Sequence, residues 1–355
     1  MGGWQLVRPA AVTPPVSVGA SAAVPGANVL WLAGAAYPSA PVVFERRAIG
    51  RWTAIPGAPT SDPVVVTGMD ASARDDVWAV GYSEPAGGPP QPIAEHSNGS
   101  RWSLVSVPAP AAGGLLLAVA ARSSADAWAV GYSGSAQLIE HWDGRAWRMT
   151  PAPAVGGVLG GVTVVPGSPV VWAVGTRTDQ PGGSLTLTER WDGQAWTVIP
   201  SPNLSNPPDA PASGLSSVAA VDRRDVWAVG NGLVPDSDRL LVEHWNGVRW
   251  AILPGQPTGT FSPDIARVPG THTLWIVATR ASGAEENETF SERITPRGGR
   301  VIATPSPDQG CEHSDQLATV SVTAAGTVWA AGFHYHLANG CGDAVTGPLL
   351  MRHAP

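Results

Sequence analysis

The sequence contains no lysine and only two cysteines, and charged residues make up only 14% of its 355 residues. Without lysine, Schiff-base catalysis and a phosphate-binding loop of the Walker type are excluded. All 21 basic residues are arginines, scattered along a chain of formal net charge −7, so we expect no nucleic acid partner. This arginine-only usage, with abundant Ala, Gly, Pro and Val, is typical of a high-GC bacterial genome.

Long apolar runs are also missing. None approaches the roughly 18 to 20 residues that cross a bilayer, so we expect no membrane span. The start Met1–Trp4 has neither the basic region nor the apolar region of a signal peptide, which is equally true of a chain whose export signal has been trimmed. Hydrophobic residues reach 43%, which is ample for the core of a globular protein.

What the sequence does contain is a repeat built on tryptophan. Each copy has an anchor Trp inside a short apolar run such as 77–81, which is typical of a strand covered on both faces. Another apolar run, for example 115–120, precedes each anchor. The anchors recur at intervals of 44 to 55 residues, at Trp31, Trp78, Trp128, Trp172, Trp227, Trp275 and Trp329.

A second pattern follows the anchors. In five copies a glutamate precedes another tryptophan by seven residues, as Glu140 precedes Trp147. Asn-Gly or Asp-Gly stands between the two in four copies, for example Asp143–Gly144, and these dipeptides supply the positive φ of a tight hairpin turn. Each repeat therefore predicts four strands, a to d.

Repeats of about 45 to 50 residues with four strands each are typical of β-propellers. We predict an all-β, seven-bladed β-propeller with four antiparallel strands per blade, forming a single domain over residues 1–355. The last blade, from about 315–355, lacks strand d, and residues 2–9 resemble that strand. We expect this N-terminal strand to close the ring by pairing into the last blade, where the similarity of 349–353 to 240–244 aligns Arg352 with Glu243.

The order of apolar strand, glycine, variable loop, acidic residue and tryptophan resembles the kelch-type propeller repeat. Kelch repeats usually carry Gly-Gly after strand b, whereas this sequence has one glycine there, as at Gly81, and Ala278 in the sixth repeat. The repeats are equally similar to those of Trp-rich secreted bacterial propellers. Both resemblances imply a fold rather than an activity.

The repeated Glu, His and Trp side chains are interpreted as framework, because a group present in most blades does not mark one site. We expect Glu140 and its counterparts to pair with turn arginines such as Arg101 or Arg249. Trp142 and its counterparts in the next two blades are interpreted as packing between blades, with a sugar-stacking strip as the alternative. The a–b and c–d links are short, whereas the b–c links range from two residues to the long segment 333–347 and the d–a links are long and rich in proline. Because variable loops on a rigid scaffold are where binding usually occurs, we expect binding on the b–c/d–a face.

The seventh repeat departs most from the pattern. Its links hold the only cysteines, Cys311 and Cys341, which we predict to form a disulfide. A disulfide favours an oxidising compartment, so we expect an extracellular or cell-surface protein. The alternative is a divalent metal held by His313, His334 and His336. Tyr335–His336 also resembles the Tyr-His pair of copper radical oxidases built on kelch-like propellers.

From these observations we predict a monomeric propeller that binds a protein or carbohydrate ligand and needs no cofactor. The alternative is an enzyme, a lyase, hydrolase or metal-dependent oxidase, at the same channel mouth near blade 7. No catalytic motif supports it, so no catalytic residue is assigned and enzyme activity stays open. The ligand-binding candidates are His313, Asp315, His334, Tyr335, His336, Asp62 and Asp264.

Overall fold

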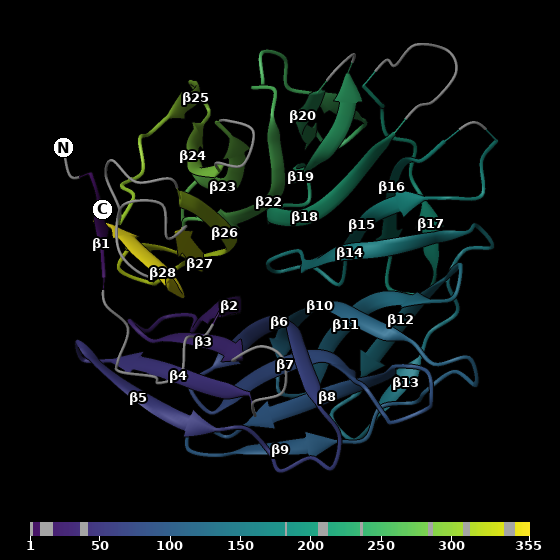
Figure 1. The fold of residues 1–355 in the computed structure, drawn as a ribbon. Helices are drawn as coiled ribbons and strands as arrows, with labels where there is room; N and C mark the ends of the chain where they lie inside the picture. The colour runs from purple at the N-terminus through teal and green to yellow at the C-terminus, as the bar shows by residue number, and fades with distance from the viewer. Residues whose placement is uncertain are drawn as a thin grey trace.

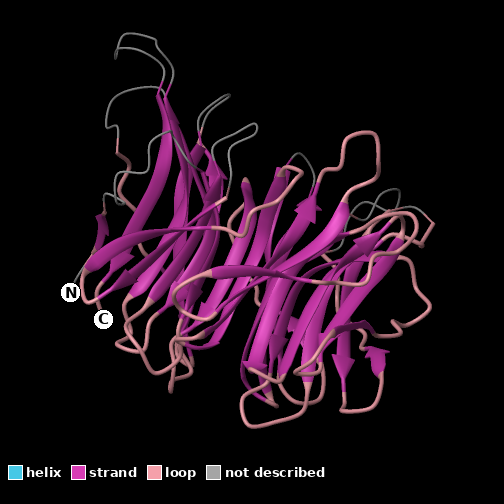
Figure 2. Cartoon of the chain, turned by 90° about the horizontal axis from the view of Figure 1, so that it is seen from below, coloured by secondary structure: helices cyan, strands magenta, loops and turns pink. Residues whose placement is uncertain are grey.

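The computed structural model shows strands joined by loops, with no helix in the described chain (Figure 2). The described residues are 3–7, 17–35, 42–181, 183–204, 212–234, 237–282, 287–307, 313–336 and 345–355. The predicted all-β class is therefore confirmed for them. Nothing in this part of the chain forms a helix long and apolar enough to cross a membrane.

Twenty of the described strands form five antiparallel sheets of four, in which the strands follow chain order. The first sheet contains β2 (Ser17–Ala23), β3 (Leu30–Ala35), β4 (Val43–Ala48) and β5 (Arg51–Pro56), and the second β6 (Val64–Ala73), β7 (Asp76–Ser83), β8 (Gln91–Ser97) and β9 (Trp102–Val105). The third contains β10 (Leu115–Ser123), β11 (Asp126–Ser133), β12 (Ala136–Trp142) and β13 (Trp147–Met149), and the fourth β14 (Gly157–Val164), β15 (Val171–Arg177), β16 (Leu185–Trp191) and β17 (Trp196–Val198). The fifth contains β18 (Ser213–Asp222), β19 (Asp225–Val234), β20 (Ser237–Trp245) and β21 (Trp250–Ile252).

The other eight strands belong to one sheet, which consists of two antiparallel groups of four. A single parallel pair, Asn287 opposite Ser314, joins the groups. The sixth group contains β22 (Thr260–Arg267), β23 (Leu274–Ala281), β24 (Asn287–Thr295) and β25 (Gly298–Val301), and the seventh group β26 (His313–Val322), β27 (Val328–His336), β28 (Val345–His353) and β1 (Trp4–Leu6).

The two ends of the chain meet in the seventh group. Trp4 pairs with His353 and Gln5 with Arg352 across antiparallel strands β1 and β28, and the amide of Val7 donates to Leu350 O at 2.8 Å. The register of β28 corrects the sequence alignment by one residue. Met351, not Arg352, stands opposite Ala330, the residue after the anchor Trp. In the other groups this place holds the repeated glutamate, so the seventh group lacks it.

The sheets and groups are arranged around a central axis, with the first strand of each, from β2 through β26, facing the middle (Figure 1). The hydrophobic core lies between neighbouring sheets. Trp78 of the second sheet is 1% exposed and packs against Trp142 of the third, with ring centroids 5.0 Å apart. The same contact joins Trp128 to Trp191 and Trp172 to Trp245, also at 5.0 Å, which matches the expected packing between repeats.

A bulge in each inner strand explains the single glycine after strand b. In β6 the bulge lies between Val66 and Gly68, and a Cβ on Gly81 of β7 would stand 1.9 Å from Val65 O. No side chain fits at that distance. In β22 two residues are unpaired between Phe261 and Asp264, and there Ala278 takes the glycine's place. In β22 the two unpaired residues leave room for the Cβ of Ala278, whereas in β6 the one-residue bulge places a carbonyl in that space.

The c–d hairpins are closed by the predicted dipeptides in a shared geometry. At 143–146 only Gly144 has positive φ, +86°, and Asp143 Oδ1 accepts the backbone N–H groups of Arg145 and Ala146, each at 2.9 Å. The Asx side chain thus satisfies two turn amides. The same two contacts recur at Asn98, Asp192 and Asn246.

Candidate functional site

Part of the predicted site lies beyond what the structure describes. Cys311 and Cys341 are outside the described residues, as are the side chains of His313 and His336. The backbones of His313 and His336 are paired across β26 and β27. Among the described residues, no group of three or more His, Cys, Asp or Glu side chains is placed to hold a metal ion.

The structure brings two predicted residues together and separates the others. Asp315 and His334 face each other across β26 and β27, both are buried, and His334 Nδ1 is hydrogen-bonded to Asp315 Oδ1. Tyr335 is half-buried beside them and pairs with Ser314. Asp62 lies in the link before β6, where it accepts the Ser61 hydroxyl at 3.2 Å. The predicted residues thus lie on different elements, with Asp62 before β6, Asp264 on β22, and Asp315 and His334 on β26 and β27.

Asp264 lines the central channel, a cavity of about 790 Å³ with a lining from all seven inner strands. Its Oδ1 accepts the Ser217 hydroxyl at 2.6 Å, and its Oδ2 accepts the amide of Val320 at 2.8 Å. Asp70, on β6, accepts the amide of Ala121 at 2.8 Å in the same way, and burial raises its pKa to about 6. Each carboxylate ties its strand to the next inner strand, so both fasten neighbouring sheets.

A histidine–aspartate pair recurs at the end of the molecule that carries the a–b and c–d turns. In the second sheet, His96 Nε2 lies 2.7 Å from Asp76 Oδ1, and His96 stands beside Trp78 with ring centroids 4.6 Å apart. His141 with Asp126 and His244 with Asp225 repeat the pair at 3.0 Å. Where the histidine is replaced by an arginine, as at Arg190, the aspartate is replaced too, by Val170. The His–Asp pair links the start of strand b to the end of strand c.

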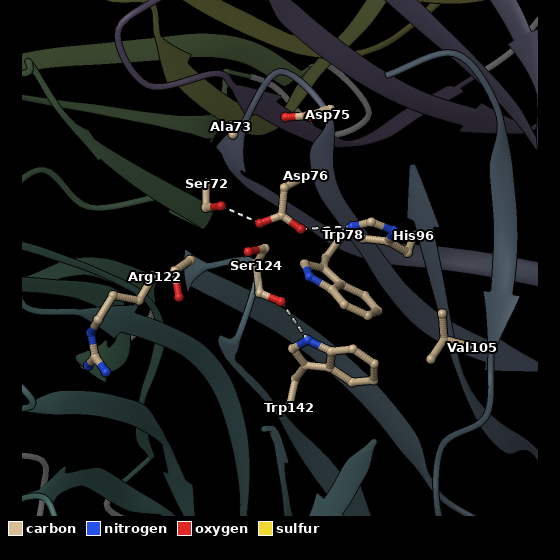
Figure 3. A pocket seen from close by; sticks show the side chains of 11 residues that line it. Ser72, Ala73, Asp75, Asp76, Trp78, His96, Val105, Arg122, Ser124 and Trp142 are labelled. Carbon is tan, nitrogen blue, oxygen red and sulfur yellow. Dashed lines mark hydrogen bonds and ion pairs between the residues drawn. The ribbon is translucent and has the colours of Figure 1, made fainter. Parts of the chain in front are cut away.

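At the junction of the second and third sheets this frame borders a pocket of about 480 Å³ (Figure 3). Trp142 forms one wall, its indole N–H donating to Ser124 O at 3.0 Å. The pocket is lined by Ser72, Ala73, Asp75, Asp76, Trp78, His96, Val105, Arg122, Ser123, Ser124 and Trp142. It therefore opens on the a–b/c–d side, opposite the face that loop lengths favoured.

A single difference between repeats explains why this junction is open. Ser72 occupies the unpaired bulge position at the end of β6, and Arg122 occupies the same position in β10. The Arg122 guanidinium is ion-paired with Asp126 and donates to Pro169 O at 3.1 Å and Val170 O at 3.3 Å, in the link between β14 and β15 of the fourth sheet. Arginine thus spans the junction of the third and fourth sheets, and serine leaves the preceding one unfilled.

The polar groups of the pocket do not form a nucleophile relay. Ser72 Oγ donates to Asp76 Oδ2, and His96 contacts Oδ1 of the same carboxylate (Figure 3). Burial opposes ionisation of Asp76, but the hydrogen bonds from His96 and Ser72 hold its pKa below the ordinary value. A serine is activated when the histidine takes its proton, whereas here the carboxylate stands between the two. Ser72 is therefore not placed to pass its proton to His96.

The repeated glutamates do not pair with turn arginines as the sequence predicted. Glu140 and Glu243 are fully buried, and none of their carboxylate oxygens has a hydrogen-bond partner among the described residues. Burial raises the pKa of each to about 8. Glu95 shows where these side chains point, since its Oε2 accepts the amide of Ala58 from the link before its sheet, at 2.8 Å. They lie between sheets, out of reach of the exposed turns.

Comparison with known proteins identifies the fold and no family. No family model matches the sequence, and neither does any curated protein. Among solved structures, YCF48 from Cyanidioschyzon merolae has a TM-score of 0.57 at 13% identity, covering 99% of both chains. Hydrazine synthase from Kuenenia stuttgartiensis has a TM-score of 0.54 at 11% identity over 79% of each chain. An ancestral GH74 enzyme has a TM-score of 0.55 at 12% identity over 98% of this chain and 48% of its own.

At these identities the likeness concerns the fold alone, which is that of a β-propeller. The sequence did not predict the pocket at Ser72, because the residue types change most in the seventh repeat. The signal for this pocket in the sequence is weaker than the changes in the seventh repeat. Segments 70–78 and 120–128 share an Ala, an Asp and a Trp at equivalent places, and four residues before the Asp of the His–Asp pair one has Ser72 and the other Arg122.

Proposed function

We propose that the chain is a seven-bladed propeller in which β1 supplies the fourth strand of the last blade. The sixth and seventh groups then form one blade each. The pairing of β1 with β28 supports this arrangement. Contacts between the seventh group and the first sheet support a closed ring, since Ser21 Oγ lies 2.8 Å from both Thr319 Oγ1 and Ser321 Oγ. The kelch-like character of the repeats is part of the same proposal.

We further propose that the protein binds carbohydrate in the pocket between the second and third sheets. The observation that carries this is the combination in one pocket of a partly exposed indole, Trp142, with carboxylate and hydroxyl groups. Aromatic faces pack on the apolar C–H faces of sugars, and carboxylates and hydroxyls orient sugar hydroxyls. Asp75 is exposed, and in the described chain it has no ion-pair partner, so its carboxylate is available to a ligand.

The test places an arginine at Ser72, as Arg122 stands at the junction of the third and fourth sheets. Ser72→Arg should fill the pocket as Arg122 fills the next one, with Asp76 in the place of Asp126. On an array of neutral and acidic glycans, we expect the wild type to bind a defined set and Ser72→Arg to lose at least about tenfold in affinity, as when a well-packed contact worth over 1.4 kcal/mol is removed. Val221→Arg, at the same bulge position of β18, is the matched control.

Two outcomes would contradict the proposal. One is a wild-type protein that binds no glycan on the array. The other is a folded Ser72→Arg protein, with an unfolding temperature close to that of Val221→Arg, that keeps wild-type glycan affinity. Trp142→Ala should weaken binding of the same glycans, since it removes the stacking face.

The enzyme alternative rests on a different observation. Asp315 and His334 form a buried, hydrogen-bonded pair in the seventh group, the repeat that departs most from the pattern. A carboxylate that orients an imidazole is the usual support of a general base. Metal analysis of protein purified without a histidine tag tests the metal-dependent form, which stoichiometric zinc or copper would favour and its absence would oppose.

A further inference from the structure

The junction between the seventh group and the first sheet repeats the frame of the glycan pocket with different chemistry. Trp329 of β27 takes the place that Trp78 has in β7. Arg352, opposite Trp329, takes the place of His96, and Thr327 that of Asp76. Arg47 takes the place of Trp142. Two cations therefore replace a histidine and an indole, and the carboxylate is gone.

Both arginines adjoin the same ring. The guanidinium carbon of Arg47 lies 4.8 Å from the centroid of Trp329, which is 2% exposed. Arg352 is the cross-strand partner of Trp329, so its side chain leaves the sheet on the same face. Gln5 Oε1 fixes Arg352 by accepting from its Nε at 3.3 Å and from one terminal nitrogen at 3.2 Å. The two guanidinium groups are thus held in position by other side chains.

The surroundings of the two guanidinium groups hold no acidic partner among the described residues. No carboxylate of that part of the chain lies within ion-pair distance of Arg47 or Arg352. Arg47 also donates no hydrogen bond there, and it is half-buried. Arg47 lies over the Trp329 ring and Arg352 is the cross-strand partner of Trp329, so the two cations are neighbours, and burial with the charge of Arg352 lowers the pKa of Arg47. Like charges held near one another without a counter-charge favour an anion between them.

We propose that Arg47 and Arg352 form a binding site for an oxyanion group, such as a phosphate, sulfate or carboxylate. The free N–H groups of Arg47 present a planar fork that matches two oxygens, and Arg352 contributes the donors that Gln5 leaves unused. The guanidinium of Arg47 is held by packing on the Trp329 ring. This site is separate from the carbohydrate pocket, because it lies at another sheet junction and shares no residue with it.

The chain supplies its own test substitution. Arg47→Trp restores the residue found at this position in the third, fourth and fifth sheets, so it should pack on Trp329 while removing the charge. Isothermal titration with inorganic phosphate, sulfate and glucuronate, each at constant ionic strength in sodium chloride, should show saturable binding of at least one anion to the wild type. Arg47→Trp and Arg352→Gln should each weaken that binding by about tenfold or more.

Arg145→Gln, at an exposed turn of the third sheet, is the control and should bind as the wild type does. The three anions distinguish the source, since preference for phosphate, sulfate or glucuronate indicates a phosphoester, a sulfated ligand or an acidic sugar. The proposal fails if none of them binds above the chloride background, or if Arg47→Trp binds as tightly as the wild type. Ser72→Arg should leave anion binding unchanged, so this test is independent of the carbohydrate proposal.

Discussion

The indole N–H of Trp4 donates to Ser291 Oγ at 2.9 Å, joining residues 287 positions apart in the chain. Trp4 also packs edge-on against Trp275 of the sixth group, with ring centroids 5.5 Å apart. The corresponding Trp147 and Trp196 have buried indole N–H groups without a partner in the described part of the chain. The N-terminal strand is thus held to the group before its own by a hydrogen bond that these two indoles do not make there.

This contact predicts that the N-terminal strand contributes to global stability. Trp4→Phe should lower the free energy of unfolding by about 1 to 2 kcal/mol, because it leaves the Ser291 hydroxyl without its donor. Trp4→Ala should cost about 3 kcal/mol or more, since it also empties the space against Trp275. Urea denaturation measures both, with Gln5→Ala as the exposed control. Unchanged midpoints for both Trp4 variants would remove the support for ring closure by β1.

A second prediction concerns the glycine after strand b. Gly81→Ala should destabilise the protein by about 2 to 3 kcal/mol, because the added Cβ meets a backbone carbonyl that the bulge holds in place. Ala278→Gly should cost about 1 kcal/mol or less, through backbone entropy alone. Thermal unfolding of the two variants gives the comparison. Equal losses would mean that the bulge does not decide which residue fits.

The buried glutamates predict that stability falls as pH rises. The folded-state pKa of Glu140 and Glu243 is about 8, above the ordinary 4.5 of the unfolded chain, so folding favours the protonated form. Their contribution is fully present below about pH 4.5 and is lost progressively as the pH rises to about 8. Glu45 and Glu189, each with a pKa of about 7, add to the loss over the same range.

Glu140→Gln tests this directly. Glutamine keeps the shape of the protonated acid, so the variant should be more stable than the wild type at pH 9, by roughly 2 kcal/mol, and similar to it at pH 5. The measurement is the urea midpoint as a function of pH. Asp143→Asn, at an exposed turn, should leave the slope between pH 5 and 9 unchanged. A wild type with constant stability over this range would show that these carboxyl groups are ionised inside the fold.

The cysteines give a prediction that rests on the sequence. If Cys311 and Cys341 are bonded, the intact mass should rise by about 2 Da on reduction, and thiol labelling without reductant should modify neither. Reduction should also lower stability by about 3 to 4 kcal/mol in the chain-entropy model. Two labelled thiols in the unreduced protein would exclude the bond and remove the argument for an oxidising compartment.

Most of the architecture could be predicted from the residues themselves. The anchor tryptophans fix the second strand of each group, and the Asn-Gly and Asp-Gly dipeptides fix the c–d hairpins, because strand burial and turn geometry depend on local residue types. Local similarity misled at Arg352, whose neighbours resemble those of Glu243. The strand pairing instead places Met351 there, and it decides the register because one residue's shift would turn every apolar side chain to the wrong face.

The sequence by itself determined the repeated four-stranded unit and the burial of most of its anchor tryptophans, because both follow from short-range patterns of apolar and turn residues. Only the tertiary structure decided that Ser72 leaves a junction open, that Arg122 fills the next, and that Arg47 and Arg352 meet at Trp329. These features depend on contacts between neighbouring sheets. Such contacts join residues about one repeat or nearly a whole chain apart, and no local pattern records which side chains will face each other there.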